Sequence, residues 1–246
     1  MKIASAQIKS TIGEINQNLE THYKMIDLAS KNGVNLIIFP EMSITGYCRE
    51  KARELSMTEF DKKLNTLKKN AVEKNITIVV GAPIKIDNKM HIGSFIFLPN
   101  NLIKIYTKQY LHDGEERYFE PSFENNPIIE INEERFSFAI CADIENELHP
   151  KKSCELNNTF YLPSIFYSKN GIDNGIEKLR NYAKKYSLNI LMSNFNGEHW
   201  NIEAGGKSCF INNKGELKSK LTTNEDGLLI IHRKNNNWES EIITIK

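Results

Sequence analysis

The chain has 246 residues, 40% of them hydrophobic, which is enough for one large domain with a sizeable core. Its 32 Lys and Arg residues nearly balance 31 Asp and Glu residues, so a net charge of +1 argues against nucleic acid or a membrane surface as a partner. No stretch approaches the roughly eighteen apolar residues of a membrane helix, and the N-terminus turns polar too early for a signal peptide. We therefore expect a cytoplasmic protein whose four cysteines are free thiols.

Strands and helices alternate in the first part of the chain. Residues 2–8 alternate as a strand, and apolar residues from position 15 to position 29 recur at helical spacing before Gly33, which is well placed to end a helix. Residues 34–40 form a nearly continuous apolar run, which is typical of a strand buried on both faces. This predicted strand ends at Glu41.

The next helix is predicted from a capping box. Ser56 and Glu59 have the spacing at which the two side chains satisfy the first N–H groups of a helix. We expect that helix to bury its apolar positions from Phe60 to Ala71. Further on, strands are predicted at 76–81, 89–98, 102–106, 128–131, 135–140, 159–163, 189–193, 207–211, 217–221, 228–232 and 241–245, with one more amphipathic helix over 172–186.

Three residues that can carry chemistry share one position in this pattern. Glu41, Lys108 and Cys141 each lie just past the C-terminal end of a predicted strand, and side chains at one edge of a sheet can converge although they are far apart in sequence. A nucleophilic thiol needs a base, which a carboxylate supplies, and an ammonium or the N–H of Ala142 can stabilise an oxyanion. Taken one at a time, each residue also has an ordinary structural interpretation. The cysteine would be a thiol packed in the core, and the glutamate and lysine would be charged side chains in contact with water.

Three sequence blocks carry a family resemblance. Residues 37–47 (Ile-Ile-Phe-Pro-Glu-Met-Ser-Ile-Thr-Gly-Tyr), 106–111 (Tyr-Thr-Lys-Gln-Tyr-Leu) and 138–143 (Phe-Ala-Ile-Cys-Ala-Asp) resemble, in order, the signature blocks of the nitrilase superfamily of carbon–nitrogen hydrolases. Residues 205–208 (Gly-Gly-Lys-Ser) and 212–215 (Asn-Asn-Lys-Gly) are similar to its last hairpin. The resemblance covers nearly the whole chain and implies an α/β fold, the four-layer α-β-β-α sandwich, as a single domain over 1–246 that forms a homodimer or larger homo-oligomer.

The resemblance also implies a role for each catalytic residue. Cys141 would be the nucleophile, Glu41 the general base, and Lys108 with the N–H of Ala142 the oxyanion site. A second glutamate of the family lies beside this triad. Glu115 matches its position best, and Glu116 is the alternative.

Two tyrosines, Tyr47 and Tyr118, are expected to contact the substrate. The partners implied are a small amide and water, without a cofactor or a metal.

The substrate class is narrowed by departures from the family pattern. Nitrile hydrolysers tend to follow the cysteine with tryptophan and glutamate, whereas this chain has Ala142 and Asp143. This favours an amide or N-carbamoyl substrate, with a nitrile as an alternative. The loop over 114–122 resembles carbamoylases and the glutaminase domains of NAD synthetases, but with no synthetase segment we expect no fused glutamine channel. A catalytically silent binding subunit on the same scaffold is the competing function.

The remaining cysteines and histidines have weaker functional patterns. Cys48, Cys154 and Cys209 lack the strand-end setting and are expected to be structural or spare thiols. The histidines at 112, 149 and 199 lack ligand-like spacing, so we expect no metal site. His112 follows the Lys108 segment, where a plain loop position is favoured over a place in the pocket wall.

Overall fold

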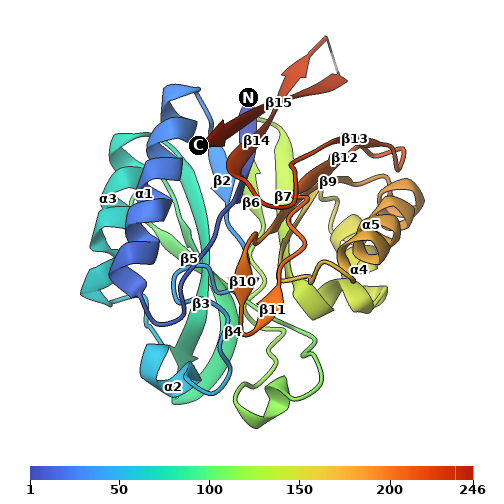
Figure 1. The fold of residues 1–246 in the computed structure, drawn as a ribbon. Helices are drawn as coiled ribbons and strands as arrows, with labels where there is room; N and C mark the ends of the chain where they lie inside the picture. The colour runs from blue at the N-terminus through green and yellow to red at the C-terminus, as the bar shows by residue number, and fades with distance from the viewer. Residues whose placement is uncertain (236, 246) are drawn as a thin grey trace.

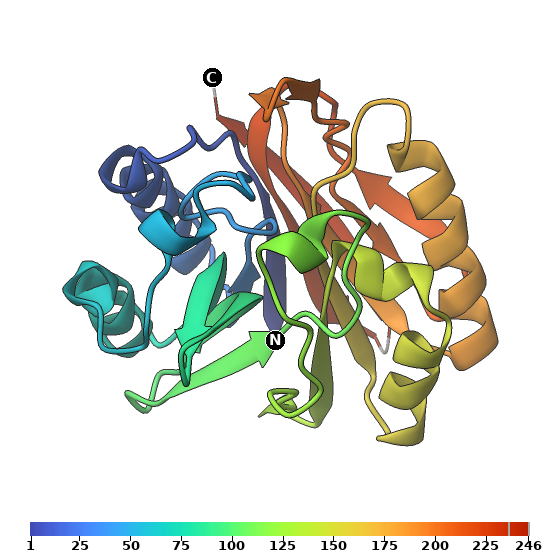
Figure 2. The ribbon, with the colours of Figure 1, turned by 90° about the horizontal axis from the view of Figure 1, so that it is seen from below.

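Two β-sheets pack face to face in the computed structural model, which describes residues 1–235 and 237–245 (Figure 1). The view from below shows helices on both outer sides of the paired sheets (Figure 2). The predicted α-β-β-α sandwich is thereby confirmed. No helix in the described part of the chain has the length and apolar character needed to cross a membrane.

The first sheet has seven strands in the order β15-β14-β1-β2-β3-β4-β5. Strands β1, β2 and β3 run parallel, while β14 pairs antiparallel with β1 and β4 pairs antiparallel with β3. Its strands are β1 (Lys2–Gln7), β2 (Leu36–Ile38), β3 (Thr77–Ile86), β4 (Lys89–Phe97), β5 (Ile103–Thr107), β14 (Asp226–Lys234) and β15 (Asn237–Ile245).

The second sheet has six strands in the order β13-β12-β9-β8-β7-β6, of which β7, β8 and β9 are parallel. Its strands are β6 (Ile129–Ile131), β7 (Glu134–Ile140), β8 (Phe160–Ile165), β9 (Asn189–Asn194), β12 (Cys209–Ile211) and β13 (Leu217–Lys220). A short ribbon, β10 (Glu198–His199) with β11 (Ile202–Glu203), lies between β9 and β12 in the chain.

Helices cover the two outer faces (Figures 1 and 2). The first sheet is covered by α1 (Ile15–Lys31) and α3 (Asn65–Glu73), and the second by α4 (Leu148–Glu155) and α5 (Ile172–Tyr186). Short helical segments complete the chain: α2 (Ala52–Leu55), η1 (Lys62–Leu64), η2 (Glu115–Arg117) and η3 (Cys141–Glu145).

Serine hydroxyls link the two sheets across their largely apolar interface. The Oγ of Ser193 on β9 donates to the carbonyl of Ala6, at 2.6 Å, while Ser164 Oγ on β8 donates to the carbonyl of Phe39, at 2.8 Å. Because a buried hydroxyl must find a partner, these bonds favour one alignment of the sheets. The second bond also fixes the end of β2, directly before Glu41.

The capping-box prediction is wrong. Ser56 instead follows the last turn of α2, and its hydroxyl donates to the carbonyl of Arg53. Asp61 caps the following turn by accepting the N–H of Lys63, so the helix begins later and Phe60 is 85% exposed. Two competing caps within six positions could not be ranked from spacing alone.

Helix α4 was not predicted. Its sequence lacks a clear apolar period, and Pro150 suggests a break. The proline occupies the first turn, where its missing N–H costs no intrahelical hydrogen bond.

Candidate active site

The ends of three strands meet at one edge of the sandwich. Glu41 follows β2, Lys108 follows β5 directly, and Cys141 follows β7 directly. The structure buries all three side chains, with Glu41 and Lys108 completely inaccessible to solvent. The convergence expected from the strand ends is therefore present.

A tight loop after β2 holds Glu41 in place. The N–H of Phe39 donates to the carbonyl of Val79 and the N–H of Ile44 to that of Gly81, so both sides of the loop are attached to β3. A Cβ at Gly81 would lie 2.3 Å from the nitrogen of Met42, which only glycine avoids. The close approach to β3 thus fixes the carboxylate in the interior.

Lys108 lies between two buried carboxylates. Its Nζ is 2.8 Å from Oε1 of Glu41 and 2.9 Å from Oε1 of Glu115. Glu115 also accepts the hydroxyl of Tyr47 and the N–H of His112, both at 2.8 Å. Two carboxyl groups thus face one ammonium away from solvent, and the Oε2 of Glu41 has no hydrogen-bond partner among the described residues. That oxygen is available to accept a proton.

The two glutamates of the loop before Phe119 have different environments. Glu115 is 1% exposed and contacts Lys108, whereas Glu116 is exposed. The geometry therefore brings Glu115 into the cluster and leaves its alternative on the surface.

Cys141 lies in a sharp turn between a strand and a helix. Its φ is +41°, in the left-handed region that residues with a Cβ rarely adopt. The turn ends β7 and begins η3, and Sγ lies 3.9 Å from the carbonyl oxygen of Phe166. Ala142 is next, in the first turn of η3, where the leading N–H groups have no partner within the helix.

Asp143 connects this turn to the segment after Lys108. Its Oδ2 accepts the N–H of Ile140 at 2.8 Å, and its Oδ1 accepts the N–H groups of Gln109 and Tyr110, both at 2.9 Å. The hydroxyl of Tyr106 donates to Oδ2 at 2.6 Å. One carboxylate therefore joins the ends of β5 and β7, although the strands belong to different sheets.

A buried histidine extends this connection. The Nε2 of His149 lies 2.8 Å from the hydroxyl of Tyr106, and its Nδ1 lies 2.8 Å from that of Tyr161. Since Tyr106 gives its hydrogen to Asp143, it accepts from Nε2–H, and Nδ1 then accepts from Tyr161. Burial lowers the pKa of His149, which agrees with this neutral form.

Burial also determines how the cluster titrates. It raises the pKa of Glu41 to about 7, against the opposing effect of Lys108. It raises the pKa of the Cys141 thiol well above its usual range, with further upward contributions from Glu41 and Glu115. Burial alone would lower the pKa of Lys108, but Glu41, Cys141 and Glu115 raise it more. The resting site therefore pairs a protonated thiol with a carboxylate that can be ionised near neutral pH.

Glu41 and Cys141 share a pocket of about 240 Å³. Its other lining residues are Tyr47, Arg49, His112, Glu115, Phe166, Tyr167, Ser168, Trp200 and Ile202. His112, expected to be a plain loop residue, is thus in the pocket wall.

The expected substrate contact of Tyr118 is not supported. Its side chain is 37% exposed and lines a separate hollow with Ala52 and Met90, because Phe119 is the aromatic residue that turns into the core.

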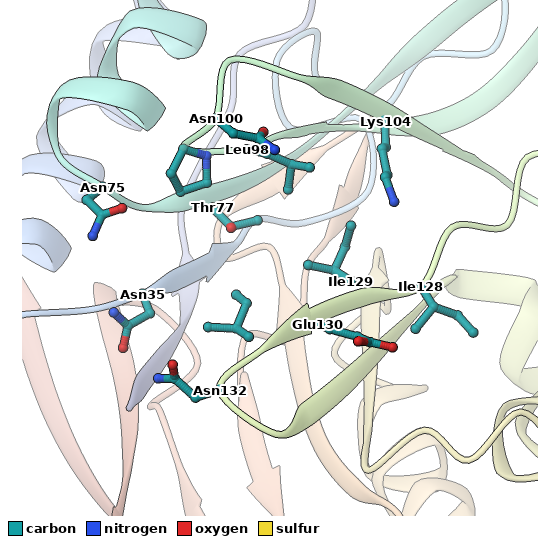
Figure 3. A pocket seen from close by; sticks show the side chains of 12 residues that line it. Asn35, Asn75, Thr77, Leu98, Asn100, Lys104, Ile128, Ile129, Glu130 and Asn132 are labelled. Atoms are coloured by element: carbon teal, nitrogen blue, oxygen red, sulfur yellow. The ribbon is translucent and has the colours of Figure 1, made fainter.

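A larger hollow of about 450 Å³ lies at the other end of the first sheet (Figure 3). It contains Asn35, which precedes β2, whereas Glu41 follows β2. Four asparagines and three isoleucines predominate among its described lining residues, which include no cysteine or histidine. The hollow with nucleophile and base is the smaller one.

Arg49, Trp200 and Asp143 were missed as site residues by sequence reasoning. Asp143 was noted only as a departure from nitrile hydrolysers, and nothing in the spacing indicated that it accepts four hydrogen bonds. Arg49 and Trp200 come from loops far apart in the chain, so only the fold brings them together. In the described residues, no group of three His, Cys, Asp or Glu side chains could hold a metal ion.

This fold and this strand-end cluster define a class of protein. The family model "Carbon-nitrogen hydrolase" matches residues 2–240, and the chain belongs to that family. The predicted membership in the nitrilase superfamily is confirmed.

Curated relatives include two kinds of protein. A glutamine-dependent NAD(+) synthetase of Acinetobacter baylyi is 26% identical over 224 residues, covering 88% of this chain and 41% of that protein. A nitrilase of Pyrococcus abyssi is 27% identical over 147 residues, covering 58% of this chain and 56% of that protein. The chain spans less than half the length of the NAD(+) synthetases it matches.

Solved structures share the fold over almost the whole chain. An amidase from Nesterenkonia sp. AN1 superposes with a TM-score of 0.84 at 19% identity, covering 96% of this chain and 93% of that one. A glutamine-dependent NAD+ synthetase from Acinetobacter baumannii superposes with a TM-score of 0.86 at 24% identity, covering 97% of this chain and 47% of that one.

Proposed function

We propose that this protein hydrolyses a small linear amide through an acyl-enzyme on Cys141. The observation that carries the proposal is the buried Glu41–Lys108–Glu115 cluster, whose two carboxylates line one small pocket together with Cys141. A charged cluster without solvent is costly to bury, and for packing alone an apolar cluster would serve. Its position beside a thiol in a strained turn favours catalysis.

The first half of the reaction forms a thioester and releases ammonia. Glu41 takes the proton from Sγ of Cys141, and the sulfur attacks the carbonyl carbon of the amide. The negative charge that develops on the oxygen is stabilised by Nζ of Lys108 and the N–H of Ala142. Glu41 then gives the proton to the amide nitrogen, the C–N bond breaks, and ammonia leaves.

The second half uses the same groups with water. Glu41 takes a proton from a water molecule, whose oxygen attacks the thioester carbonyl. The C–S bond breaks, the proton held by Glu41 returns to sulfur, and the carboxylic acid is released. Glu115 contacts Lys108 and Tyr47 and so positions the ammonium throughout. One water is consumed and one ammonia is formed for each amide.

Ammonia release by the purified protein tests the proposal. The panel contains short aliphatic amides, glutamine, monoamides of dicarboxylic acids and N-carbamoyl amino acids, with Cys141→Ala as the blank. Butyramide belongs in the panel because a structural neighbour, an amidase, was solved in complex with it. We expect release above the blank for at least one amide. Nitriles run in parallel, and turnover of nitriles alone would contradict the proposed substrate class.

A labelling experiment distinguishes an enzyme from a silent subunit. An electrophilic amide such as fluoroacetamide should modify Cys141 faster than Cys48, Cys154 and Cys209, as read by peptide mass spectrometry. The matched variant Glu41→Gln should lower this selectivity, since it removes the base. Equal labelling of all four thiols, with no ammonia released from the panel, would favour a binding role.

A further inference from the structure

Arg49 is the cation of the pocket wall that the catalytic cluster does not use. It is half-buried and lines the same hollow as Glu41 and Cys141. The reaction as derived above needs one ammonium at the oxyanion, and Lys108 supplies it. The presence of Arg49 in the pocket wall is therefore not explained by the oxyanion.

The guanidinium of Arg49 is held in a defined orientation. Its Nε donates to the hydroxyl of Tyr47 at 2.7 Å, and its Nη1 donates to the carbonyl of Asp113 at 2.8 Å. Its central carbon lies 4.7 Å from the ring centroid of Trp200, at a distance typical of cation–π contact. A Cβ on Gly114 would lie 2.8 Å from Nη1, so a glycine leaves room for this arrangement.

Arg49 has no anionic partner among the residues that the structure describes. Its guanidinium forms no ion pair within 4.0 Å with any carboxylate of the described residues, whereas Arg135, Arg180 and Arg233 each do. Arg53 and Arg117, which also form no ion pair with the described residues, are exposed to water. Of the five N–H donors of a guanidinium, two bond to described residues and the other three have no partner among those residues. A half-buried cation with fixed geometry and free donors is suited to an anionic ligand.

We propose that Arg49 binds a carboxylate at the far end of the substrate, so that the preferred substrates are short linear amides that carry a terminal carboxylate. This inference rests on the proposed amidase function and names its substrate class. A planar carboxylate matches the guanidinium fork in two-point contact. The pocket holds about 240 Å³, which restricts the chain between amide and carboxylate to a few methylene groups. Trp200 and Ile202 supply apolar walls for those methylenes.

Matched pairs of substrates test the inference. Malonamate, succinamate, glutaramate and adipamate are each compared with the corresponding neutral diamide, which has the same length and nearly the same shape. For the wild-type protein, we expect kcat/KM for the best acid to exceed that for its diamide by about 30-fold or more, the scale of a partly buried charge pair. Arg49→Met should reduce this ratio to near one, mainly through a higher KM for the acid.

Two further variants separate recognition from structural support. Arg49→Lys keeps the positive charge but loses the planar pair of N–H donors. Its kcat/KM ratio of acid to diamide should therefore lie between those of Arg49→Met and the wild-type protein. Arg53→Met removes an exposed arginine from the same segment and should leave the ratio unchanged. Because Arg49 also contacts Tyr47, its variants can slow all substrates, and the ratio cancels that common effect.

The outcomes distinguish this inference from the proposed function. If the wild-type protein hydrolyses the diamides as well as the acids, or if Arg49→Met lowers both by the same factor, the carboxylate site is wrong while the amidase function stands. If no amide releases ammonia above the Cys141→Ala blank, the proposed function fails first and the inference fails with it.

Discussion

At the scale of single residues, the site depends on the cost of burying charge. Glu41 is completely buried, and its pKa is raised to about 7 although Lys108 opposes the shift. An ordinary glutamate near 4.5 would be fully ionised at neutral pH and a weak base. The raised pKa makes Glu41 a stronger base that is still ionised in part at neutral pH, as proton transfer in both directions requires.

The pH dependence of the reaction follows from this shift. Below pH 7 Glu41 is mostly protonated and cannot accept the thiol proton, so kcat/KM should rise with pH and level off above about 7 to 8. Because the buried groups interact, the apparent pKa of this profile describes the cluster of Glu41, Lys108, Glu115 and Cys141 rather than Glu41 alone. Steady-state rates from pH 5 to 9 on a neutral amide measure it. A profile that is flat down to pH 5 would contradict a base whose pKa is raised to about 7.

Glu115 and Glu116 provide a matched comparison of neighbouring carboxylates. Glu115→Gln removes one of two charges opposite Lys108, and its amide NH2 cannot replace both acceptors used by Tyr47 and the N–H of His112. We expect kcat to fall by about 100-fold or more, on the scale of a lost electrostatic contact in a catalytic site. Glu116→Gln, at an exposed position, should be close to wild type. Equal effects of the two variants would refute the assignment.

At the scale of elements, the site depends on how strand ends are joined. The ends of β5 and β7 carry Lys108 and Cys141, and Asp143 connects them with three backbone N–H groups and one tyrosine hydroxyl. An ionised carboxylate accepts such bonds on both oxygens, and bonds to a charged group are stronger than neutral ones. Asp143 is therefore a positioning residue between two sheets.

Asp143→Asn tests this role, because one of its two terminal groups becomes a donor and cannot accept from backbone N–H. We expect a loss of about 2–3 kcal/mol in the free energy of unfolding, the scale of lost charged hydrogen bonds, and a lower kcat with a smaller change in KM. Denaturant titration and kinetics measure the two effects. The control Asp113→Asn changes an exposed aspartate of the nearby loop. A variant with wild-type kcat would remove Asp143 from the positioning of the site.

Strands and helices with a strong apolar periodicity could be predicted from the sequence. Element ends that depend on which of two neighbouring residues caps a helix could not. The strand predicted over 135–140 corresponds to β7 (Glu134–Ile140), with Cys141 directly after its end as expected. The start of the helix after α2 depended on whether Ser56 or Asp61 caps it, which spacing does not decide. The residues of the pocket wall were harder still to predict from sequence, because Arg49 and Trp200 come into contact only when distant loops fold together.

At the scale of the whole molecule, each of the two sheets contributes different residues to the same site. The first sheet supplies Glu41 and Lys108, and the second supplies Cys141. Inter-sheet bonds such as that from Ser164 to the carbonyl of Phe39 therefore fix the base relative to the nucleophile. Sheet alignment is thus part of the catalytic geometry as well as of stability.

The outer helices carry an exposed apolar side chain. We propose that the protein forms a dimer in which the outer helices of two copies pack together. Leu148 at the start of α4 is 60% exposed, on the helix layer that covers the second sheet (Figure 2). Burying such a side chain against a second copy would contribute about 1–2 kcal/mol. Light scattering should then give about twice 28.3 kDa for the wild-type protein. Leu148→Glu should shift it toward the monomer by placing charges in the interface.

Leu102 offers the control for this experiment. It is 56% exposed and lies at the turn between β4 and β5 of the first sheet, outside α4, so Leu102→Glu should leave the mass unchanged. A wild-type monomer at micromolar concentration would reject the dimer. Dissociation by Leu102→Glu rather than by Leu148→Glu would instead place the contact at the β4–β5 turn, and the helices would then need another explanation for their exposed leucine.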